Sequence, residues 1–228
     1  GTKVKLHKKD GDKLSRNSLI MVVEGKLKDL LKTERSALDI LQRMSGIATL
    51  TSKLKEKVKN RVAIAPTRKT QWRYLDKKAV YAGGGLTHRL ALWESILIKD
   101  NHLKAIKKLH IKNPIKTALK DSSRNKKAVF MEIEVTNKKD AIKAAETFKE
   151  LTLKKPCLIM LDNIKPKKLK QIIRQLKKLN LYSHVLIEAS GGITPHNIKT
   201  YANTGVDVVS LGYLTHSVKI LDISHSIV

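Results

Sequence analysis

The sequence predicts an α/β protein whose larger part is built around a parallel β-sheet, either open or closed into a barrel. Short apolar or β-branched runs recur after residue 60, and helical patterns with recognisable starts separate the later ones. Strands and helices that alternate at this spacing are typical of βα units. A length of 228 residues allows one large domain with a buried core, or such a domain with a small appendage.

The first elements are short β-like segments and a long helix. The segments TKVKLHK and SLIMVVEG flank the turn signal KKDGDK, and they are too short to form an independent domain. From Thr33, a good N-cap residue, apolar residues recur at helical spacing as far as Val58. We therefore expect one long helix after Thr33, or two helices broken near Gly46.

Six apolar runs are the predicted strands of the parallel sheet. They are RVAIA (61–65), SILI (95–98), AVFMEIEV (128–135), CLIML (157–161), HVLIEA (184–189) and VDVVSL (206–211). Helix starts are predicted at Thr136-Asn137 with Asp140 following, at Pro166, and at Thr194-Pro195, where the pattern closes on Gly205.

Composition limits the classes of function. The net charge of +27 favours anionic partners, which include nucleic acid, membrane surfaces and small phosphorylated or carboxylated molecules. Most of the excess is lysine in amphipathic segments such as 103–127, which a solvated helix face explains as well as a nucleic-acid footprint does. Aromatic residues make up only 4%, so the core should consist of Leu, Ile, Val and Ala, with few rings for stacking on bases.

The chain contains no run of about 18 apolar residues and no signal-like start, so we expect a soluble, cytoplasmic protein. The single cysteine, Cys157, excludes an internal disulfide and a multi-cysteine zinc site. Because Cys157 lies in a predicted strand, we expect it to pack as a small apolar residue.

Polar residues follow nearly every predicted strand, at the end that faces the active site in βα barrels. They are Thr67-Arg68-Lys69-Thr70, Lys99-Asp100-Asn101-His102, Asp162-Asn163, Ser190-Gly191-Gly192 and Gly212, with Glu132 and Glu134 inside the third strand. We expect these groups, which are distant in sequence, to converge on one pocket.

The last two strands are each followed by glycine, in SGGIT (190–194) and SLG (210–212). Glycine lets backbone N–H groups approach an anion, and barrel enzymes often bind phosphate with these two loops. We favour phosphate binding over the alternative of two tight turns.

Two carboxylates on neighbouring strands, Glu134 and Asp162, are candidates for binding Mg²⁺ or sugar hydroxyls, with Asn163 assisting. Glu132 has the same parity as Glu134, so strand alternation does not distinguish the two. The alternative is that one of them pairs with a neighbouring lysine.

Candidate cations lie in separate segments: Arg35, Arg68, Lys69, His88, Arg89 and Lys99. If they converge, their mutual repulsion predicts a multiply charged anion as the ligand. A lone histidine is more often structural, but three glycines precede His88 and an arginine follows it, so we interpret it as a ligand contact. The sequence has none of the patterns GxGxxG, GxxxxGK[ST], HExxH or GxSxG.

Together, ERSALDILQRMSGIATLT, TRKT, AGGGLTHRLALWESILIKDNH, EIEV, LDN, EASGGIT and GYLTHSVKILDIS resemble the quinolinate phosphoribosyltransferase family, in order from about residue 20 to the end. The resemblance implies an α/β fold in which an incomplete parallel α/β barrel follows a small N-terminal α/β sandwich domain. It further implies homodimers, or higher assemblies of dimers. The implied reaction joins quinolinate to 5-phosphoribosyl-1-pyrophosphate in the presence of Mg²⁺, giving nicotinate mononucleotide, pyrophosphate and CO₂ in NAD biosynthesis.

The same resemblance divides the chain into an apparently truncated remnant of the sandwich domain at 1–33, completed by about 213–228, and a barrel domain at 34–212. It assigns the quinolinate carboxylates to Arg68, His88, Arg89 and Lys99, with Arg35 supplied across the dimer interface. Lys69 is implied at the junction of the two substrates. Glu134 and Asp162 are implied near the ribose hydroxyls and the metal, directly or through water. The phosphoribosyl pyrophosphate site is completed by Asn163, Ser190, Gly191, Gly192 and Gly212, and Lys69, Glu134 and Asp162 are the implied catalytic residues.

Two departures from the family pattern stand out. TRKT is usually followed by a Pro-Gly pair, whereas this chain has Gln71-Trp72-Arg73, which leaves the loop shape and ligand preference open. Only 33 residues precede ERSALD, so we expect the leading helices to be absent, in a fragment, a processed form or a reduced enzyme.

Alternatives to this reading are a relative that acts on nicotinate or another substrate, such as the molybdenum-transport-associated homologue, a nucleic-acid-binding protein and a non-catalytic scaffold. The intact IKDNH motif and the full set of cations favour quinolinate.

Overall fold

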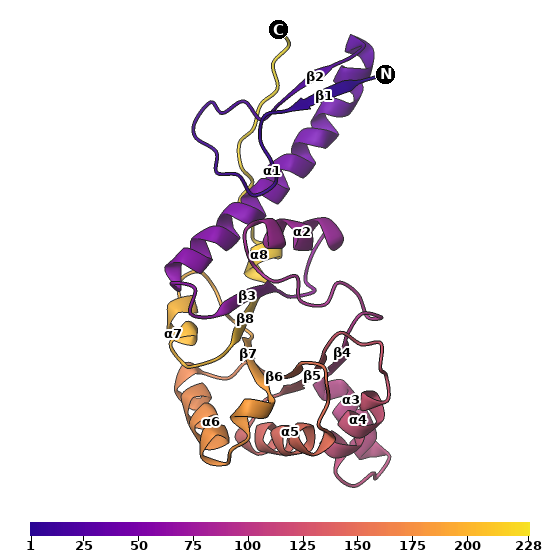
Figure 1. Cartoon of the computed structure of the whole chain (residues 1–228), viewed down its shortest axis with the longest axis vertical. Coiled ribbons are helices and arrows are strands. Elements are labelled where there is room, and N and C mark those ends of the chain that lie inside the picture. Colours follow the sequence, from indigo (N-terminus) through magenta and orange to yellow (C-terminus); the bar gives the residue numbers. More distant parts are fainter.

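The computed structural model describes residues 1–228 and contains two separate sheets (Figure 1). Strands β1 (Lys3–Leu6) and β2 (Met21–Glu24) form an antiparallel pair near the N-terminus. The larger sheet is parallel, in the order β3-β8-β7-β6-β5-β4. Its strands are β3 (Ala63–Pro66), β4 (Ile96–Ile98), β5 (Met131–Val135), β6 (Cys157–Asp162), β7 (Leu186–Ser190) and β8 (Val208–Leu211). Because β3 and β4 do not pair with each other, the barrel is incomplete, and the predicted fold class is confirmed.

Helices connect the strands and cover the outside of the barrel (Figure 1). They are α1 (Leu27–Lys57), α2 (Tyr74–Ala82), α3 (Asp100–Lys108), α4 (Pro114–Ser123), α5 (Lys138–Leu151), α6 (Pro166–Lys178), α7 (Ile198–Ala202) and α8 (Tyr213–His216), with a 3₁₀ helix at Tyr182–His184. The predicted start of α5 is confirmed, because Asn137 Oδ1 accepts the N–H of Asp140 at 2.9 Å. The predicted start of α6 is also confirmed, because Pro166 is its first residue.

Helix α1 is continuous and begins at Leu27, so the predicted start after Thr33 is wrong. Thr33 lies inside the helix, where its Oγ1 donates to the carbonyl oxygen of Asp29 at 2.9 Å instead of capping a helix end. Gly46 does not break the helix. A Cβ at Gly46 would lie 2.2 Å from the carbonyl oxygen of Lys219, so glycine lets the C-terminal segment cross α1 closely at this point.

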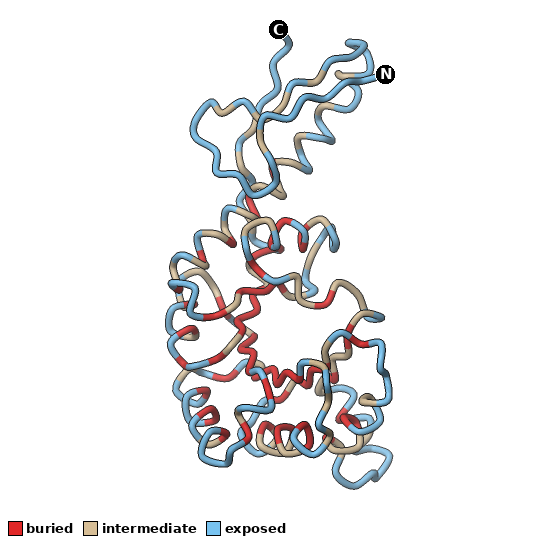
Figure 2. The backbone as a smooth tube through the Cα atoms, viewed as in Figure 1, coloured by how far each residue is buried: buried red, intermediate tan, exposed pale blue.

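The buried core lies between the sheet and the surrounding helices (Figure 2). It consists mainly of Ile, Val, Leu and Ala, and Phe148 is its only aromatic residue. Cys157 is buried at the start of β6, as predicted, and burial raises the pKa of its thiol to about 11. No helix combines the length and apolar character needed to cross a membrane.

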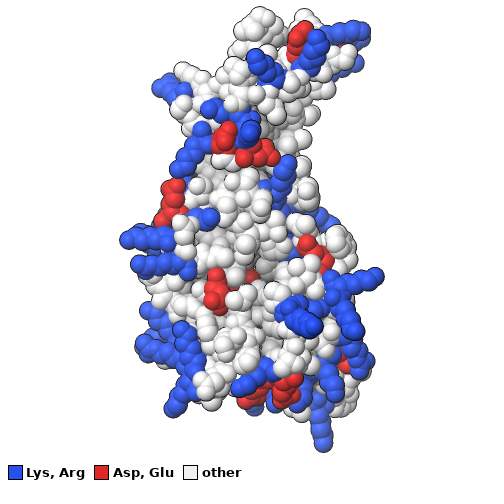
Figure 3. All heavy atoms as spheres, in the orientation of Figure 1, with Lys and Arg blue, Asp and Glu red and all other residues white.

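Lysine and arginine side chains line the outer rim of the barrel on the face that Figure 3 shows. Helix α6 illustrates the origin of this charge. Its buried side includes Leu169 and Ile172, whereas Lys167, Lys168 and Lys170 are exposed. Much of the positive charge therefore lies on solvated faces of amphipathic helices.

The N-terminal half of α1 extends away from the barrel beside β1, β2 and the C-terminal segment (Figure 1). Leu221 N donates to the carbonyl oxygen of Gln42 at 3.0 Å, and Gln42 Nε2 donates to the carbonyl oxygen of Ile223 at 2.8 Å. His225 Nδ1 lies 2.7 Å from Glu34 Oε2. The domain division at residues 33 and 34 stays a prediction, and α1 runs across it.

Candidate active site

The carboxyl ends of neighbouring strands place Glu134 and Asp162 close together. Glu134 is level with Met160 in the sheet, and Asp162 is the last residue of β6, level with Ser190. Burial first, and then the charge of Asp162, raise the pKa of the Glu134 carboxyl. Lys99 opposes this shift, because its Nζ lies 3.8 Å from Glu134 Oε2. The structure therefore brings together the predicted carboxylates and the lysine that follows β4.

The loop after β7 contacts the loop after β6 through a glycine. Gly191 has φ +89°, and a Cβ there would lie 2.4 Å from Asn163 Oδ1 and 2.8 Å from its backbone nitrogen. Asn163 N donates to the carbonyl oxygen of Ser190 at 2.9 Å, and Asn163 Nδ2 donates to Asp162 Oδ2 at 2.6 Å. Gly192 has φ +62° with no atom within 4 Å of its Cβ position. The loop is thus fixed at Gly191 and leaves open space at Gly192.

The loop after β8 abuts the loop that carries Arg68 and Lys69. A Cβ at Gly212 would lie 2.9 Å from the His216 ring and 3.3 Å from Thr67 Oγ1. Strands β3 and β8 are neighbours in the sheet, which explains this contact. Arg68 and Lys69 are exposed beside it, so both side chains are accessible to a ligand.

Three cations lie close enough to affect one another electrostatically: Arg68, Lys77 and Arg89. Burial first, and then the charge of Arg68, lower the pKa of Arg89, which is only 4% exposed. Burial also lowers the pKa of Lys77 to about 8, and the charges of Arg89 and Arg68 add to that shift. An anionic ligand would stabilise such a group of like charges, and its binding here stays a prediction.

His88 faces two fully buried carboxylates instead of open space. Its Nε2 lies 3.1 Å from Glu132 Oε2 and 3.3 Å from Glu188 Oε2. Burial alone would lower the pKa of His88, but the two glutamates outweigh it and raise the pKa to about 10. The N–H of Arg89 points at Nδ1 from 2.8 Å and disfavours a second ring proton. Two buried carboxylates outweigh this single contact, so we take His88 as the imidazolium.

The structure resolves the ambiguity between Glu132 and Glu134. Both side chains point to the same face of β5, as their parity requires. Glu132 is fully buried and contacts His88, whereas Glu134 is partly exposed and contacts Lys99. Glu134 is therefore the glutamate of this pair that a ligand can reach.

Arg35 does not join these residues within one chain. It lies on the part of α1 that projects from the barrel, with a side chain that is 69% exposed and an Nη1 that lies 3.6 Å from Asp39 Oδ1. The other predicted site residues all lie in the barrel part of the chain. Most lie at or near the carboxyl ends of β3, β4, β5, β6, β7 and β8, whereas His88 and Arg89 lie in the connection between α2 and β4.

The glycines before His88 serve helix packing. A Cβ at Gly83 would lie 2.4 Å from the carbonyl oxygen of Ala48 in α1. A Cβ at Gly85 would lie 2.9 Å from the carbonyl oxygen of Ile64 and from a Thr51 methyl group. Glycine is needed at these two positions because α1, α2 and β3 approach one another closely there.

Sequence reasoning missed three buried charged residues near the site: Asp76, Lys77 and Glu188. A signal was present for each. Asp76 and Lys77 lie four and three residues before Val80, on the apolar side of α2. Glu188 precedes Ser190 by two residues, as Glu132 precedes Glu134, so it has the parity of an inward-facing position.

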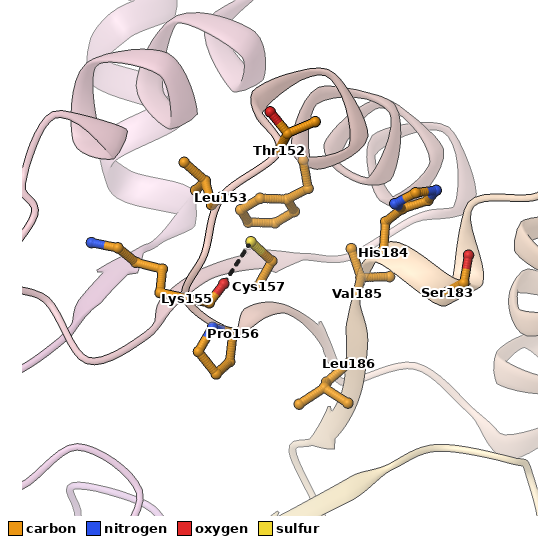
Figure 4. Close-up of a pocket in the computed structure, with 10 residues that line it drawn as sticks. Thr152, Leu153, Lys155, Pro156, Cys157, Ser183, His184, Val185 and Leu186 are labelled. Carbon is orange, nitrogen blue, oxygen red and sulfur yellow. Dashed lines mark hydrogen bonds between the residues drawn. The ribbon is translucent and has the colours of Figure 1, made fainter.

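A separate hollow of about 320 Å³ lies at the opposite ends of β6 and β7, where these strands begin (Figure 4). Leu153, Pro156 and Val185 are among its lining residues, and Cys157 Sγ lies 3.6 Å from the carbonyl oxygen of Lys155. The Lys155 side chain extends away and donates to the carbonyl oxygen of Asn125. This hollow has none of the converging charges found at the carboxyl ends of the strands.

Comparison with known proteins identifies the family. The model of the quinolinate phosphoribosyl transferase C-terminal domain matches residues 47–226, and that of the N-terminal domain matches residues 1–45. A probable nicotinate-nucleotide pyrophosphorylase [carboxylating] of Bacillus subtilis is 40% identical, over 96% of this chain and 71% of that protein. One from Archaeoglobus fulgidus is 39% identical, over 95% of this chain and 80% of that protein.

A solved structure agrees with this assignment. The crystal structure of NadC from Streptococcus pyogenes superposes with a TM-score of 0.81 at 33% identity, covering 97% of this chain and 73% of that one. The similarity therefore extends over both sheets and the helices between them. The chain belongs to the quinolinate phosphoribosyltransferase family.

Proposed function

We propose that this chain transfers the phosphoribosyl group of 5-phosphoribosyl-1-pyrophosphate to quinolinate with decarboxylation, giving nicotinate mononucleotide, pyrophosphate and CO₂ in NAD biosynthesis. It would thus be a pentosyltransferase. The observation that carries the proposal is the presence, in one barrel, of a group of neighbouring cations and a pair of neighbouring carboxylates. The cationic group contains Arg68 and Arg89, and the carboxylates are Glu134 and Asp162.

Quinolinate carries two carboxylates, and the cationic group matches that charge. The pKa of Arg89 is lowered first by burial and then by the charge of Arg68, so the two guanidinium groups are close enough to repel each other. A dianion between them relieves this repulsion, and guanidinium groups can hold carboxylates through two hydrogen bonds. Lys99 and His88 would complete the pocket. To contact quinolinate, the His88 ring would either rotate away from Glu132 and Glu188 or stay beside them and share its ring proton with them.

The second substrate would lie across the glycine loops. The open space at Gly192 suits a phosphate, with the exposed Lys69 between the two substrates. Glu134 and Asp162 would accept hydrogen bonds from ribose hydroxyls. Their mutual repulsion, together with oxygen donors on adjacent strands, also fits a divalent cation bound directly or through water. When bound, Mg²⁺ supplies charge neutralisation for the departing pyrophosphate.

The residues would act by orienting the substrates and by electrostatic stabilisation. The quinolinate nitrogen is held against C1 of the ribose, which becomes cationic as its bond to pyrophosphate breaks. Bond formation leaves a positive charge on the ring nitrogen. The C–C bond to the adjacent carboxylate then breaks, CO₂ leaves, and the electron pair stays on the ring carbon beside that nitrogen until a proton replaces it. No covalent nucleophile is required.

The test is an assay of the purified chain with Mg²⁺, phosphoribosyl pyrophosphate and either quinolinate or nicotinate, following nicotinate mononucleotide and CO₂. Product with CO₂ from quinolinate alone supports the proposal. Product only from nicotinate would assign the chain to the sister reaction, and no product from either would refute both. Arg89→Ala should abolish quinolinate turnover with the fold retained, whereas Arg61→Ala, at an exposed arginine bonded to Asn203, is the control and should not. Chelation of Mg²⁺ should stop turnover.

We further propose a homodimer, or a higher assembly of dimers, in which Arg35 enters the partner's site. Two observations support this. Arg35 is exposed and far from the site of its own chain, and the same projecting region exposes apolar side chains at Val4, Leu6, Leu27 and Leu31. An interface would bury these apolar residues.

Subunit complementation tests this arrangement. Arg35→Ala and Arg89→Ala homodimers should each be inactive. After mixing and exchange, half of the dimers contain one intact site, so about a quarter of the wild-type activity should return. No recovery after proven exchange would place Arg35 and Arg89 in one chain's site, or Arg35 outside the site. The cytoplasmic location stays a prediction.

A further inference from the structure

Two adjacent charged residues of α2, Asp76 and Lys77, are buried without belonging to the predicted substrate contacts. They are 0% and 2% exposed, respectively. Charged side chains are almost never fully buried unless they are paired. Neighbouring residues on a helix point about 100° apart, so the two side chains reach different parts of the structure.

Asp76 holds the loop that carries Arg68 and Lys69. Its Oδ2 accepts the N–H groups of Gln71 at 3.2 Å and Trp72 at 3.3 Å. These amides lie immediately after the TRKT segment, so the carboxylate fixes the end of the loop. A proline at either position would have no N–H to donate. In the Pro-Gly pair of the family pattern, a proline at position 71 would remove the first of these bonds, whereas a glycine at position 72 would keep the second, so the double anchor depends on Gln71.

Arg43 on α1 balances the charge of Asp76 and extends the network. Its Nε and Nη2 donate to the two oxygens of Asp76 at 2.8 and 2.9 Å, and its guanidinium lies 5.3 Å from the centre of the Trp72 ring. Arg43 Nη2 also donates to the carbonyl oxygen of Thr215 at 2.8 Å. Thr215 Oγ1 in turn donates to the carbonyl oxygen of Lys69 at 2.7 Å. The loop is thus held at its end and at Lys69.

Lys77 holds the turn that carries His88 and Arg89. Its Nζ donates to the carbonyl oxygen of Thr87 at 2.9 Å and to that of Arg89. His88, between these two carbonyls, has φ +53°, a left-handed conformation that costs energy for any residue with a side chain. Such a conformation persists only where the surroundings fix it. The ammonium group of Lys77 does so from both sides.

We propose that Asp76 and Lys77 are positioning residues that aim the Arg68-Lys69 loop and the His88-Arg89 turn at one dianionic substrate. One turn of one helix then sets the relative placement of two cation pairs, one from the loop before α2 and one from the connection after it. The proposal rests on the proposed function for its kinetic consequence. The structural consequence, local fixation of two loops, is independent of the reaction.

The kinetic test compares Lys77→Met with Lys78→Met. Methionine is close to lysine in length but donates no hydrogen bond, and Lys78 is half exposed on the same helix, paired with Asp10 at 3.2 Å. Lys77→Met should raise KM for quinolinate by at least about tenfold, with KM for phosphoribosyl pyrophosphate within about twofold, because two charge-assisted hydrogen bonds are lost beside the quinolinate contacts. Lys78→Met should match the wild type. Equal rises in both KM values, or none, would overturn the proposal.

Asp76→Asn is the reciprocal variant. It keeps the shape but removes the charge that holds Arg43, so kcat should fall about tenfold or more as Lys69 loses its placement. Unchanged kcat, with folding intact, would count against the role of Asp76.

Hydrogen exchange measured on the free chain separates this proposal from the proposed function. Asp76→Asn should speed exchange of the Gln71 and Trp72 amides but not of Leu90, whose N–H donates to Glu94. Lys77→Met should do the reverse. This crossed pattern would support positioning even in a chain without quinolinate activity, whereas uniform loosening in both variants would refute it. If Lys77→Met does not fold, Lys77→Gln takes its place. Its neutral, shorter side chain loses the charge of both hydrogen bonds, so the same changes are expected at a smaller size.

Discussion

Replacing Glu188 by glutamine should change how the stability of the fold depends on pH. Glu132 and Glu188 are both fully buried, and each lies within 3.3 Å of His88 Nε2. Burial first, and then the charge of Glu188, raise the pKa of Glu132 from 4.5 to about 7, against the opposing effect of His88. Glutamine keeps the shape of Glu188 and removes its charge, so the pKa of Glu132 should fall.

The sign follows from proton binding. The folded chain holds the Glu132 proton between pH 4.5 and 7, where the unfolded chain releases it, so the free energy of unfolding decreases as the pH rises through this window. The full shift corresponds to about 3 kcal/mol at most. Below pH 6.5, His88 is protonated in both states, because its folded pKa is raised to about 10, and it adds no slope there.

Urea unfolding followed by circular dichroism at pH 5 and pH 6.5 measures this effect. In the wild type, the cluster of Glu132, Glu188 and His88 should make the free energy of unfolding up to about 2 kcal/mol lower at pH 6.5 than at pH 5. In Glu188→Gln this decrease should shrink to less than half. Glu56→Gln, at a glutamate whose side chain is 65% exposed, controls for the loss of one negative charge. The same decrease in all three proteins would refute the assignment of the titrating group to this cluster.

Three further predictions concern glycines, the thiol and a tyrosine hydroxyl. Gly83→Ala should destabilise the fold by about 2 kcal/mol or more, because its Cβ would lie 2.4 Å from the Ala48 carbonyl oxygen. Gly192→Ala has free space around its Cβ but φ +62°, so it should cost only about 1 kcal/mol of stability. Its main effect should be weaker binding of phosphoribosyl pyrophosphate. Denaturant unfolding and KM measurements distinguish the two. Cys157 should react with maleimide at pH 7 much more slowly than a free thiol, since burial raises its pKa to about 11, and rapid labelling of the folded chain would contradict this. Tyr182→Phe should cost about 1 kcal/mol, because the Tyr182 hydroxyl lies 3.1 Å from Asp207 Oδ1, and an unchanged unfolding midpoint would exclude that contribution.

The sequence was most informative at the strand ends. Short apolar runs bounded by polar residues predicted where β6 and β7 end, and the parallel arrangement then placed Asp162 beside Ser190. Parity correctly put Glu132 and Glu134 on one face of β5. Strand parity does not say how far along the barrel axis each glutamate lies. That position decides that Glu132 contacts His88, whereas Glu134 contacts Lys99.

Other features depend on partners that only the fold brings together. Lys77 binds carbonyl groups ten and twelve residues away, and carbonyl groups have no residue-specific signal in a sequence. The start of α1 was misjudged because Thr33 satisfies its hydroxyl inside the helix as readily as it would at a cap. His88 was expected to face a ligand, whereas in the free chain the charges of the two glutamates attract it inward.

The continuity of α1 has a mechanical consequence. Its 31 residues make a rod of about 46 Å at 1.5 Å per residue, shared by the barrel at one end and the projecting strands at the other. The C-terminal segment crosses this rod at Gly46, where the carbonyl group of Lys219 contacts it. In the proposed dimer, a tilt of α1 about that point would move Arg35 relative to the partner's barrel. The geometry of each site would therefore depend on the orientation of the partner's helix α1.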